Sequence, residues 1–269
     1  LDNFIDRAPT PTTLFNDFGY AVDQNVVSEV YYSGAFVKTE RREIHNVSID
    51  NRGDAQTQTI KSYITNDNGL TYSLVTYQEL TNREFDSDHN IKNQMILTYD
   101  NDSLTKILLD AQEVRSIGFH SSGVALKQII ATFTDATKSS LIDVKVIENL
   151  DISLQGYVKE SKITRYDGLI NYDGQAGDLV VDGTKTVDEQ HIWTTSFDLR
   201  GNALEQRIVK SYFDTETQAL VFSEAQKIST ADTYDIHNRA QESFIRSYKD
   251  STFATFKDEM QHVIYSSYD

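Results

Sequence analysis

The stretch WTTSFDLRGNALEQRIVKSY, residues 193–212, decides the fold. Its first part reads as a strand that ends at Phe197. Asp198 accepts a backbone N–H two residues further on and so begins a turn, and Gly201 supplies a positive φ without a clash at Cβ. A short loop with Gly in the left-handed position commonly closes a β-hairpin, and residues 203–212 form the return strand. This stretch therefore predicts two antiparallel strands joined by a tight turn.

The same phrase recurs seven times along the 269 residues. In full, it has an apolar or aromatic opening residue, Asp or Asn, a Gly, an Ala, a Gln and an Ile- or Val-containing run that ends in an aromatic residue. The copies open at Phe15, Ile49, Phe85, Phe119, Ile152, Phe197 and Tyr234, with gaps of 34, 36, 34, 33, 45 and 37 residues. A period of this size indicates stacked supersecondary units. Repetition builds surfaces and lengths more readily than it builds one active site.

Three positions of the phrase carry a structural requirement. Offset 4 from the opening residue is Gly in five copies and Asn238 in the seventh, so we expect a left-handed residue in these turns, and the third copy, with His89 there, is the weakest fit. Offset 9 is Gln in five copies and offset 11 is Ile or Val in all seven, so both lie on one face of the return strand, where the Gln residues are expected to form an amide ladder. The closing aromatic falls at offset 14 in five copies, on the opposite face. It comes later in the first and sixth copies (Tyr31 and Tyr212), where we expect a local bulge.

The predicted fold class is all-β. About 20 residues separate each closing aromatic from the next turn, enough for a loop and a second strand. We expect an antiparallel meander of about seven β-hairpin repeats, with a period of about 34–37 residues, that forms a curled sheet, a spiral shell or a β-solenoid-like array. Residues 1–14 are predicted to be an N-terminal extension or linker and residues 15–269 the repeat array. The Gly/Asp-rich residues 168–183 are predicted to be an inserted loop or small hairpin, and residues 253–262 a strand in preference to a short helix.

Composition narrows the classes of function. The 41 Asp and Glu residues against 25 Lys and Arg give a formal charge of −16, which argues against nucleic acid as a partner, since nucleic acid requires clustered cations. Cysteine is absent, which excludes thiol catalysis and Cys-ligated zinc. No hydrophobic run approaches the ~20 residues that span a bilayer. The chain also lacks a Gly-x-Ser-x-Gly nucleophile elbow. We therefore predict that it is not an enzyme and has no catalytic, cofactor-binding or metal-binding residue.

Two groups of turn residues are the alternatives to a plain solvated rim. Stacked turns would gather three imidazoles suited to a transition metal, those of His89, His120 and His237. They would also gather carboxylates suited to structural Ca²⁺, those of Asp50, Asp54, Asp86, Asp88, Asp198 and Asp235. No EF-hand or nonapeptide calcium pattern occurs, so the prediction remains no cofactor, with structural Ca²⁺ as the alternative. Trp193, the sole Trp, is expected to pack in a core, with a sugar-stacking platform as the alternative.

The turn phrase resembles the YD repeats of the Rhs-type bacterial proteins. Its best matches are Phe197-Asp198-Leu199-Arg200-Gly201 and Tyr234-Asp235-Ile236-His237-Asn238, and the resemblance extends over residues 15–269. Rhs-type proteins are large surface or secreted proteins whose hairpins spiral into a hollow shell. The units of this chain are longer, and an Ala-x-x-Gln and a closing Tyr replace much of the consensus, so it also resembles giant repetitive bacterial cell-surface proteins. Either resemblance implies an extracellular structural or adhesive role.

The expected function is that of a structural repeat protein, a segment or subunit of a large bacterial surface or extracellular assembly such as a shell, filament or sheath. Residues 268–269, Tyr-Asp, stand 34 residues after Tyr234-Asp235, where an eighth phrase would open. We therefore expect association with further copies or adjacent repeats through edge strands, and no nucleic acid or membrane span. The alternative is a ligand- or glycan-binding adhesin module that uses the ladder face, which carries Gln and Ile.

Overall fold

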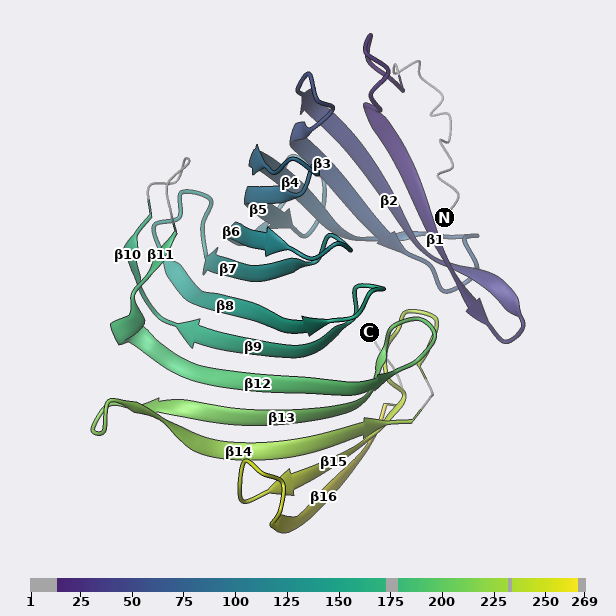
Figure 1. Ribbon diagram of the computed structural model, residues 1–269. Coiled ribbons are helices and arrows are strands. Elements are labelled where there is room, and N and C mark those ends of the chain that lie inside the picture. The colour runs from purple at the N-terminus through teal and green to yellow at the C-terminus, as the bar shows by residue number, and fades with distance from the viewer. Residues whose placement is uncertain (1–13, 173–178, 232–233, 266–269) are drawn as a thin grey trace. The chain divides into compact units, whose positions relative to one another are not determined.

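A single antiparallel sheet dominates the computed structural model, which describes residues 14–172, 179–231 and 234–265. In this part of the chain fourteen strands lie in sequence order from β1 to β16, and β10 and β11 form a separate two-stranded sheet (Figure 1). The order is linear, with β1 at one end and β16 at the other. The predicted all-β meander of hairpins is therefore confirmed. The described residues contain no helix with the length and apolar character that a membrane crossing requires.

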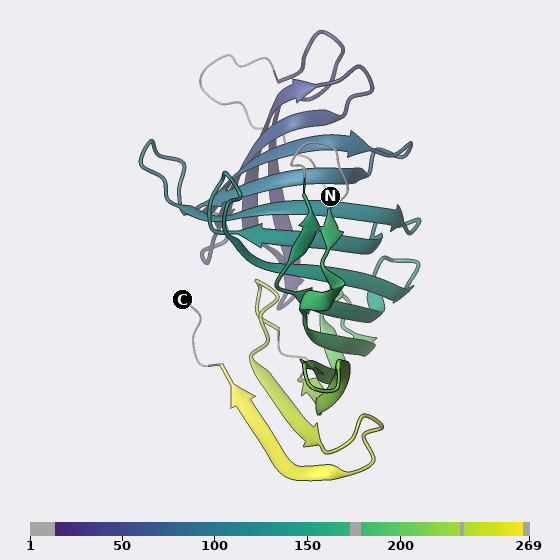
Figure 2. The ribbon, with the colours of Figure 1, turned by 90° about the vertical axis from the view of Figure 1, so that its left-hand side faces the viewer.

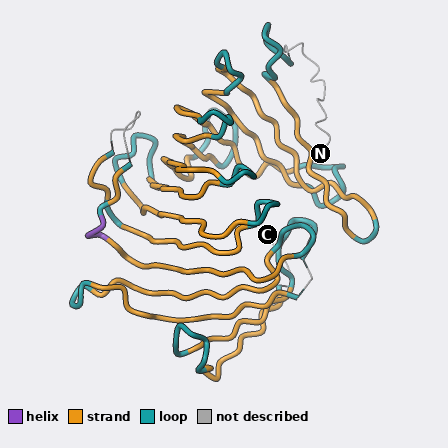
Figure 3. Tube along the Cα trace, viewed as in Figure 1, coloured by secondary structure: helices purple, strands orange, loops and turns teal. Residues whose placement is uncertain are grey.

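The strands of the large sheet are long and are joined by short loops (Figure 3). They are β1 (Asp23–Tyr32), β2 (Ala35–Ile49), β3 (Ala55–Ile64), β4 (Ser73–Phe85), β5 (Ile91–Tyr99), β6 (Leu108–Phe119), β7 (Ala125–Phe133), β8 (Leu141–Ile152), β9 (Val158–Tyr166), β12 (Thr186–Phe197), β13 (Ala203–Asp214), β14 (Ala219–Thr230), β15 (Glu242–Tyr248) and β16 (Phe256–Ile264). The segment predicted as a strand at residues 253–262 is thus a strand, β16.

The insertion at residues 168–183 contains the small antiparallel pair β10 (Leu169–Asn171) and β11 (Val180–Val181), followed by the 3₁₀ turn η1 (Gly183–Lys185). Residues 173–178 of this insertion lie outside the described residues, as do residues 1–13 of the predicted N-terminal extension and the Tyr-Asp at 268–269. The extra length of the fifth gap is therefore taken up beside the large sheet, because β9 pairs directly with β12.

Contacts divide the chain into two compact units. Among the described residues, the first comprises residues 14–115 and Ala131–Ile142, and the second comprises Ser116–Ile130, Asp143–Tyr172, residues 179–231 and residues 234–265. Each unit contains consecutive hairpins, whose order Figure 2 follows from purple to yellow.

All seven turns place a left-handed residue at the predicted position. The residues with positive φ at offset 4 are Gly19, Gly53, His89, Gly123, Gly156, Gly201 and Asn238. The third turn, the weakest fit to the phrase, adopts the same conformation, with φ of 66° at His89. The second residue of the turn accepts N–H groups two and four residues on, as Asp198 Oδ1 does from Arg200 and Asn202 at 2.8 Å each. The same double acceptance occurs at Asn16, Asp50, Asp86 and Asp235.

Successive turns contact one another through two positions, offset 5 of one turn and offset 4 of the next. In the first unit, a Cβ on Gly53 would lie 2.8 Å from Cε1 of Tyr20, so the Tyr20 ring covers this glycine. In the second unit, Tyr157 covers Gly201 in the same way, at 2.7 Å. The glycine therefore serves two purposes, since it provides the left-handed conformation and leaves room for the ring of the preceding turn.

Where offset 4 is not Gly, the contact is polar. Asp54 Oδ1 lies 2.6 Å from Nδ1 of His89, and Asn202 donates a hydrogen bond to Oδ1 of Asn238 at 3.0 Å. Arginine at offset 3 adds a second link, because Arg200 donates to the carbonyl oxygen of the next turn at 2.8 Å. Each of these junctions uses offset 5 of one turn and offset 4 of the next, and the two residues match in size or in hydrogen bonding.

The ladder face carries hydrogen-bonded amides. In the first unit, Gln58 donates to Asn46 Oδ1 at 2.6 Å, Asn82 donates to Gln58 Oε1 at 3.2 Å, and Gln94 donates to Asn82 Oδ1 at 2.6 Å. The predicted amide ladder is therefore present in this unit, but asparagines on the first strand of each hairpin alternate with the glutamines. In the second unit, the corresponding Gln residues bond hydroxyl groups: Gln128 to Ser116, and Gln206 to Thr194.

Register shifts recur at the end of the first strand of several hairpins, as between Asn82 and Glu84, and also on the return strand at offsets 13 and 14. Those on the return strand lie between Ser28/Glu29, Ser62/Tyr63, Thr98/Tyr99 and Lys210/Ser211. The bulges expected in the first and sixth copies are confirmed, but the extra residues of those copies do not cause them, because the second and third copies bulge at the same offsets. Tyr31 and Tyr212 therefore lie beyond the position that Tyr63 and Tyr99 occupy.

The interior is small and mixed. Buried apolar side chains such as Leu97, Phe133 and Val144 are no more numerous than buried polar ones among the described residues. Buried polar groups cost free energy unless they are hydrogen-bonded, and here many belong to the ladder or to the turns. The fold thus depends on strand pairing and satisfied polar contacts as much as on an apolar core.

Candidate functional site

The three turn histidines do not form a common site. His89 pairs with Asp54 of the preceding turn, His120 Nδ1 lies 2.8 Å from Ser122 Oγ of its own turn, and the backbone of His237 donates to Asp235. Within the described residues, no three His, Cys, Asp or Glu side chains are grouped so as to hold a metal ion.

The turn carboxylates are engaged by the turns themselves. The N–H of Asp54 bonds to the Asp50 carboxylate and lowers its pKa, and the Asn90 side chain does the same for Asp86. Burial raises the pKa of Asp198, but hydrogen bonds to its carboxylate outweigh burial and leave the pKa below the usual value. Asp54 pairs with Arg52 and His89, and Asp235 bonds to Arg239 at 2.7 Å. Asp88 lies in the same turn as Asp86. The oxygens of Asp50, Asp86, Asp198 and Asp235 accept from donors of their own turns, and the described residues contain no group of three such side chains that could hold a metal ion.

A buried ion network lies in the first unit and has no counterpart in the sequence prediction. Glu113 is fully buried on β6. Arg83 donates to its two oxygens at 2.7 and 2.9 Å, and Arg115 and Lys138 add contacts at 2.9 and 2.8 Å. Arg83 is the residue skipped by a register shift on β4, and such a bulge re-aims a side chain. The network links β4, β6 and the loop between β7 and β8, which is a structural role.

Cations near the closing aromatics are also compensated. Arg41 lies 4.5 Å from the Tyr63 ring centroid and pairs with Glu43 at 3.1 Å. Lys106, in the loop between β5 and β6, lies 4.1 Å from the Tyr99 ring centroid. Burial and the Glu43 carboxylate raise the pKa of Tyr63. Cation–π contacts of this kind fix side chains against the sheet. Arg41 and Lys106 also have carboxylate partners, Glu43 and Glu79, which compensate their charge.

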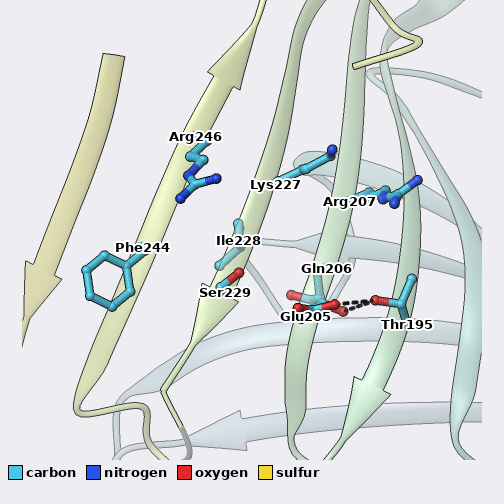
Figure 4. A pocket seen from close by; sticks show the side chains of 9 residues that line it. All are labelled: Thr195, Glu205, Gln206, Arg207, Lys227, Ile228, Ser229, Phe244 and Arg246. Atoms are coloured by element: carbon cyan, nitrogen blue, oxygen red, sulfur yellow. Dashed lines mark hydrogen bonds between the residues drawn. The ribbon is translucent and has the colours of Figure 1, made fainter. Parts of the chain in front are cut away.

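A different arrangement occurs in the second unit, where three cations stand side by side. Arg207 on β13 lies directly opposite Lys227 on β14, which lies directly opposite Arg246 on β15. We call these three residues the cationic row. Trp193 lies opposite Arg207 at one end, and Met260 lies opposite Arg246 at the other. Figure 4 shows the three side chains next to one another across their strands.

The cationic row lines a hollow of about 340 Å³ on the sheet. The other lining residues are Thr195, Glu205, Gln206, Ile228, Ser229 and Phe244 (Figure 4). Thr195 donates to Glu205 Oε2 at 3.2 Å, and Phe244 stacks on His262 with the ring centroids 4.4 Å apart. Lys227 Nζ lies 5.0 Å from the Tyr248 ring centroid, which holds the middle cation in place.

A second hollow in the same unit, of about 350 Å³, is lined by charges that cancel. There Lys127 pairs with Glu148 at 2.9 Å and Lys162 pairs with Glu189 at 2.8 Å. The cationic row differs because, in the described part of the chain, its three members have no carboxylate partner. The first hollow is therefore the candidate site.

Sequence reasoning missed this site because its residues belong to three strands. The available signal was a set of like charges, Arg207, Lys227 and Arg246, spaced 20 and 19 residues apart, close to the distance between facing strands. Trp193 is partly buried at the end of the row and stacks on His191 at 3.8 Å, so it is held by a neighbouring ring. In comparisons with known proteins, neither a protein-family model nor a curated sequence matches this chain.

Proposed function

We propose that this chain is a structural repeat protein, a segment or subunit of a larger assembly at a bacterial surface or outside the cell, which associates through its sheet edges. The observation that carries the proposal is the contact between successive turns. Offset 5 of one hairpin meets offset 4 of the next at Tyr20/Gly53, at Asp54/His89 and again at Tyr157/Gly201. A contact that requires only another hairpin can be repeated along an array, whereas a catalytic centre occurs once.

The two end strands supply the surfaces for association. Strands β1 and β16 each have one neighbour in the described part of the sheet. Edge strands present unpaired N–H and C=O groups that recruit further strands. Antiparallel pairing of β16 of one copy with β1 of another would extend the sheets of both copies. Such a head-to-tail contact leads to filaments or sheaths if it does not close.

The exposed side chains on β16 support this use of the edge. Met260 and Ile264 are 54% and 67% exposed, and Tyr265 directly after the strand is 43% exposed. The resemblance of the turn phrase to YD repeats supports a bacterial surface or secreted location. A shell, a filament and a sheath are all compatible with end-to-end continuation of one sheet.

The test is the native mass of the 269-residue chain, measured by sedimentation over a wide concentration range. The proposal expects species well above 30.6 kDa. Ile264→Lys places a charge on the edge strand and should shift the protein toward 30.6 kDa, since lysine is a common edge-blocking residue. The matched control is Leu199→Lys, which adds the same charge at a fully exposed turn and should leave the mass distribution unchanged. A wild-type monomer at high concentration, or equal association by both variants, would refute the proposal.

A binding module is the second candidate, and the open cationic row favours it. The ladder face is a less suitable surface, because the amides of Asn46, Gln58 and Asn82 are already hydrogen-bonded to one another. The cationic row lies on the other face, since Arg207 and Gln206 are consecutive residues of one strand. Binding at this row and structural association are compatible in one chain.

A further inference from the structure

We propose that the cationic row binds an acidic saccharide, a ligand that carries carboxylate or sulfate groups on a hydroxylated scaffold. The inference deepens the second candidate function and does not depend on association through the sheet edges. It rests on the placement of Arg207, Lys227 and Arg246, on the absence of acids opposite them, and on the residues that line the hollow.

The placement of three cations side by side should reduce the stability of the sheet. Like charges directly opposite one another on neighbouring strands destabilise a sheet. Strands are about 4.8 Å apart, so the three cations lie within about 10 Å. The chain has a formal charge of −16, and other cations of the same strands are paired, as Lys210 is with Glu224 at 3.7 Å. In so acidic a chain, three neighbouring cations without carboxylate partners form a site suited to an anionic ligand.

The row matches a ligand with more than one anionic group. The guanidinium groups of Arg207 and Arg246 each present a planar fork of donors suited to a carboxylate or sulfate. Lys227 lies between them as a point charge, fixed by the aromatic ring of Tyr248. Two guanidinium groups with one lysine between them suit two or three anionic groups on a ligand that crosses the strands.

The rest of the hollow indicates hydroxyl groups and an apolar face on the same ligand. Thr195 and Ser229 supply hydroxyls, and Glu205 supplies an acceptor that a sugar hydroxyl can use. Phe244 offers a ring beside the row (Figure 4). A glutamate at the rim opposes a uniformly charged polymer such as nucleic acid, which also requires far more cationic contacts than three. Anionic groups, hydroxyls and an apolar ring face occur together in acidic saccharides.

Titration calorimetry on the full chain would test the inference, with four probes of equal length. Oligogalacturonate carries carboxylates, sulfated malto-oligosaccharide carries sulfates, unmodified malto-oligosaccharide is neutral, and tetraglutamate is an acidic peptide. We expect binding of one or both acidic saccharides that weakens as salt is added, and none of the neutral one. The stronger of the two acidic saccharides identifies the anionic group.

Arg207→Gln/Arg246→Gln should weaken binding by about tenfold for each arginine, because a charge-assisted hydrogen bond contributes on that order. The matched control is Lys210→Gln on the opposite face of β13, which should bind within about twofold of wild type. The double variant should also unfold at the same or a higher temperature than wild type, since like charges are removed. This readout separates loss of the site from loss of the fold.

Several results would overturn the inference. They are no binding of either acidic saccharide by wild type, equal binding of the neutral saccharide, and wild-type affinity in the Arg207→Gln/Arg246→Gln variant. Tetraglutamate that binds as tightly as the saccharides would also overturn it, since the occupant would then be an acidic peptide. None of these outcomes bears on the native mass, so the structural proposal stands or falls separately.

Discussion

Replacing Gly53 by Ala perturbs the junction between two turns in a way that the structure quantifies. Gly53 has φ of +91°, so an alanine there carries the left-handed cost of about 1–2 kcal/mol. Its Cβ would also lie 2.8 Å from Cε1 and 3.0 Å from Cδ1 of Tyr20, closer than van der Waals contact allows. Relieving such a clash costs about 1–3 kcal/mol. The Gly53→Ala variant should therefore lose about 2–5 kcal/mol of local stability.

Gly19→Ala is the matched control for this variant. Gly19 occupies the same offset of the preceding turn, with φ of +81°, and a Cβ added there would meet no atom within 4 Å. Gly19→Ala should therefore lose only the left-handed cost of about 1–2 kcal/mol. The Tyr20→Ala/Gly53→Ala double variant should recover the remainder, with a coupling free energy of about 1–3 kcal/mol between the two positions.

Native-state hydrogen exchange is the suitable assay, because it reports the local stability of each turn separately from the unfolding of the whole chain. The reporter is the Gly53 N–H, which donates to the Asp50 carbonyl oxygen at 3.1 Å. Its protection should fall much further in Gly53→Ala than the protection of the Gly19 N–H falls in Gly19→Ala. Equal losses at the two sites, or no coupling between Tyr20 and Gly53, would refute the role given to the turn junction.

Three further predictions concern the first unit. Glu113→Gln leaves the buried cations around it without their counter-charge, and it should lower the free energy of unfolding in urea by about 3–5 kcal/mol. Glu43→Gln removes the charge of a part-exposed pair and should cost less than about 1 kcal/mol. Equal costs would contradict a stabilising role for the buried network. Asn82→Leu removes the hydrogen bonds of the amide ladder on both sides of this residue and should lower the free energy of unfolding by about 1–3 kcal/mol, measured by thermal unfolding. An unchanged stability would show that the ladder does not stabilise the sheet. The Thr137 hydroxyl and nearby N–H donors hold the pKa of Asp135 at about 2, so its contribution is complete above its ordinary pKa of about 4 and is lost as pH falls toward about 2. Urea midpoints of wild type and Asp135→Asn should therefore converge between pH 5 and pH 2, and a constant difference would contradict this.

The turns were predictable from the sequence because their requirement is local. A positive φ at offset 4 follows from Gly in five copies and from Asn238, whereas histidine at position 89 does not by itself indicate it. The amide ladder was only half predicted. Gln58 and Gln94 follow from the phrase, but their partners Asn46 and Asn82 lie on the other strand of each hairpin, twelve residues earlier. Identifying them requires the pairing register, which the loop length and the bulges determine.

The ion network and the cationic row could not be predicted for the same reason. Arg83 and Glu113 are thirty residues apart, and a register shift turns Arg83 toward Glu113. The sequence does not reveal such a register shift, because no particular residue type marks the position of the bulge. The cationic row likewise depends on two successive registers, from Arg207 to Lys227 and from Lys227 to Arg246.

The matched pairs at the turn junctions have a consequence for how the array avoids folding errors. Similar repeats invite misassembly, in which a hairpin docks one period away from its proper neighbour. Tyr20 fits over Gly53 but would meet a bulky imidazole at His89, which instead requires the carboxylate of Asp54. The junctions at Gly53 and His89 are therefore not interchangeable, which disfavours a shift of the first hairpins by one period.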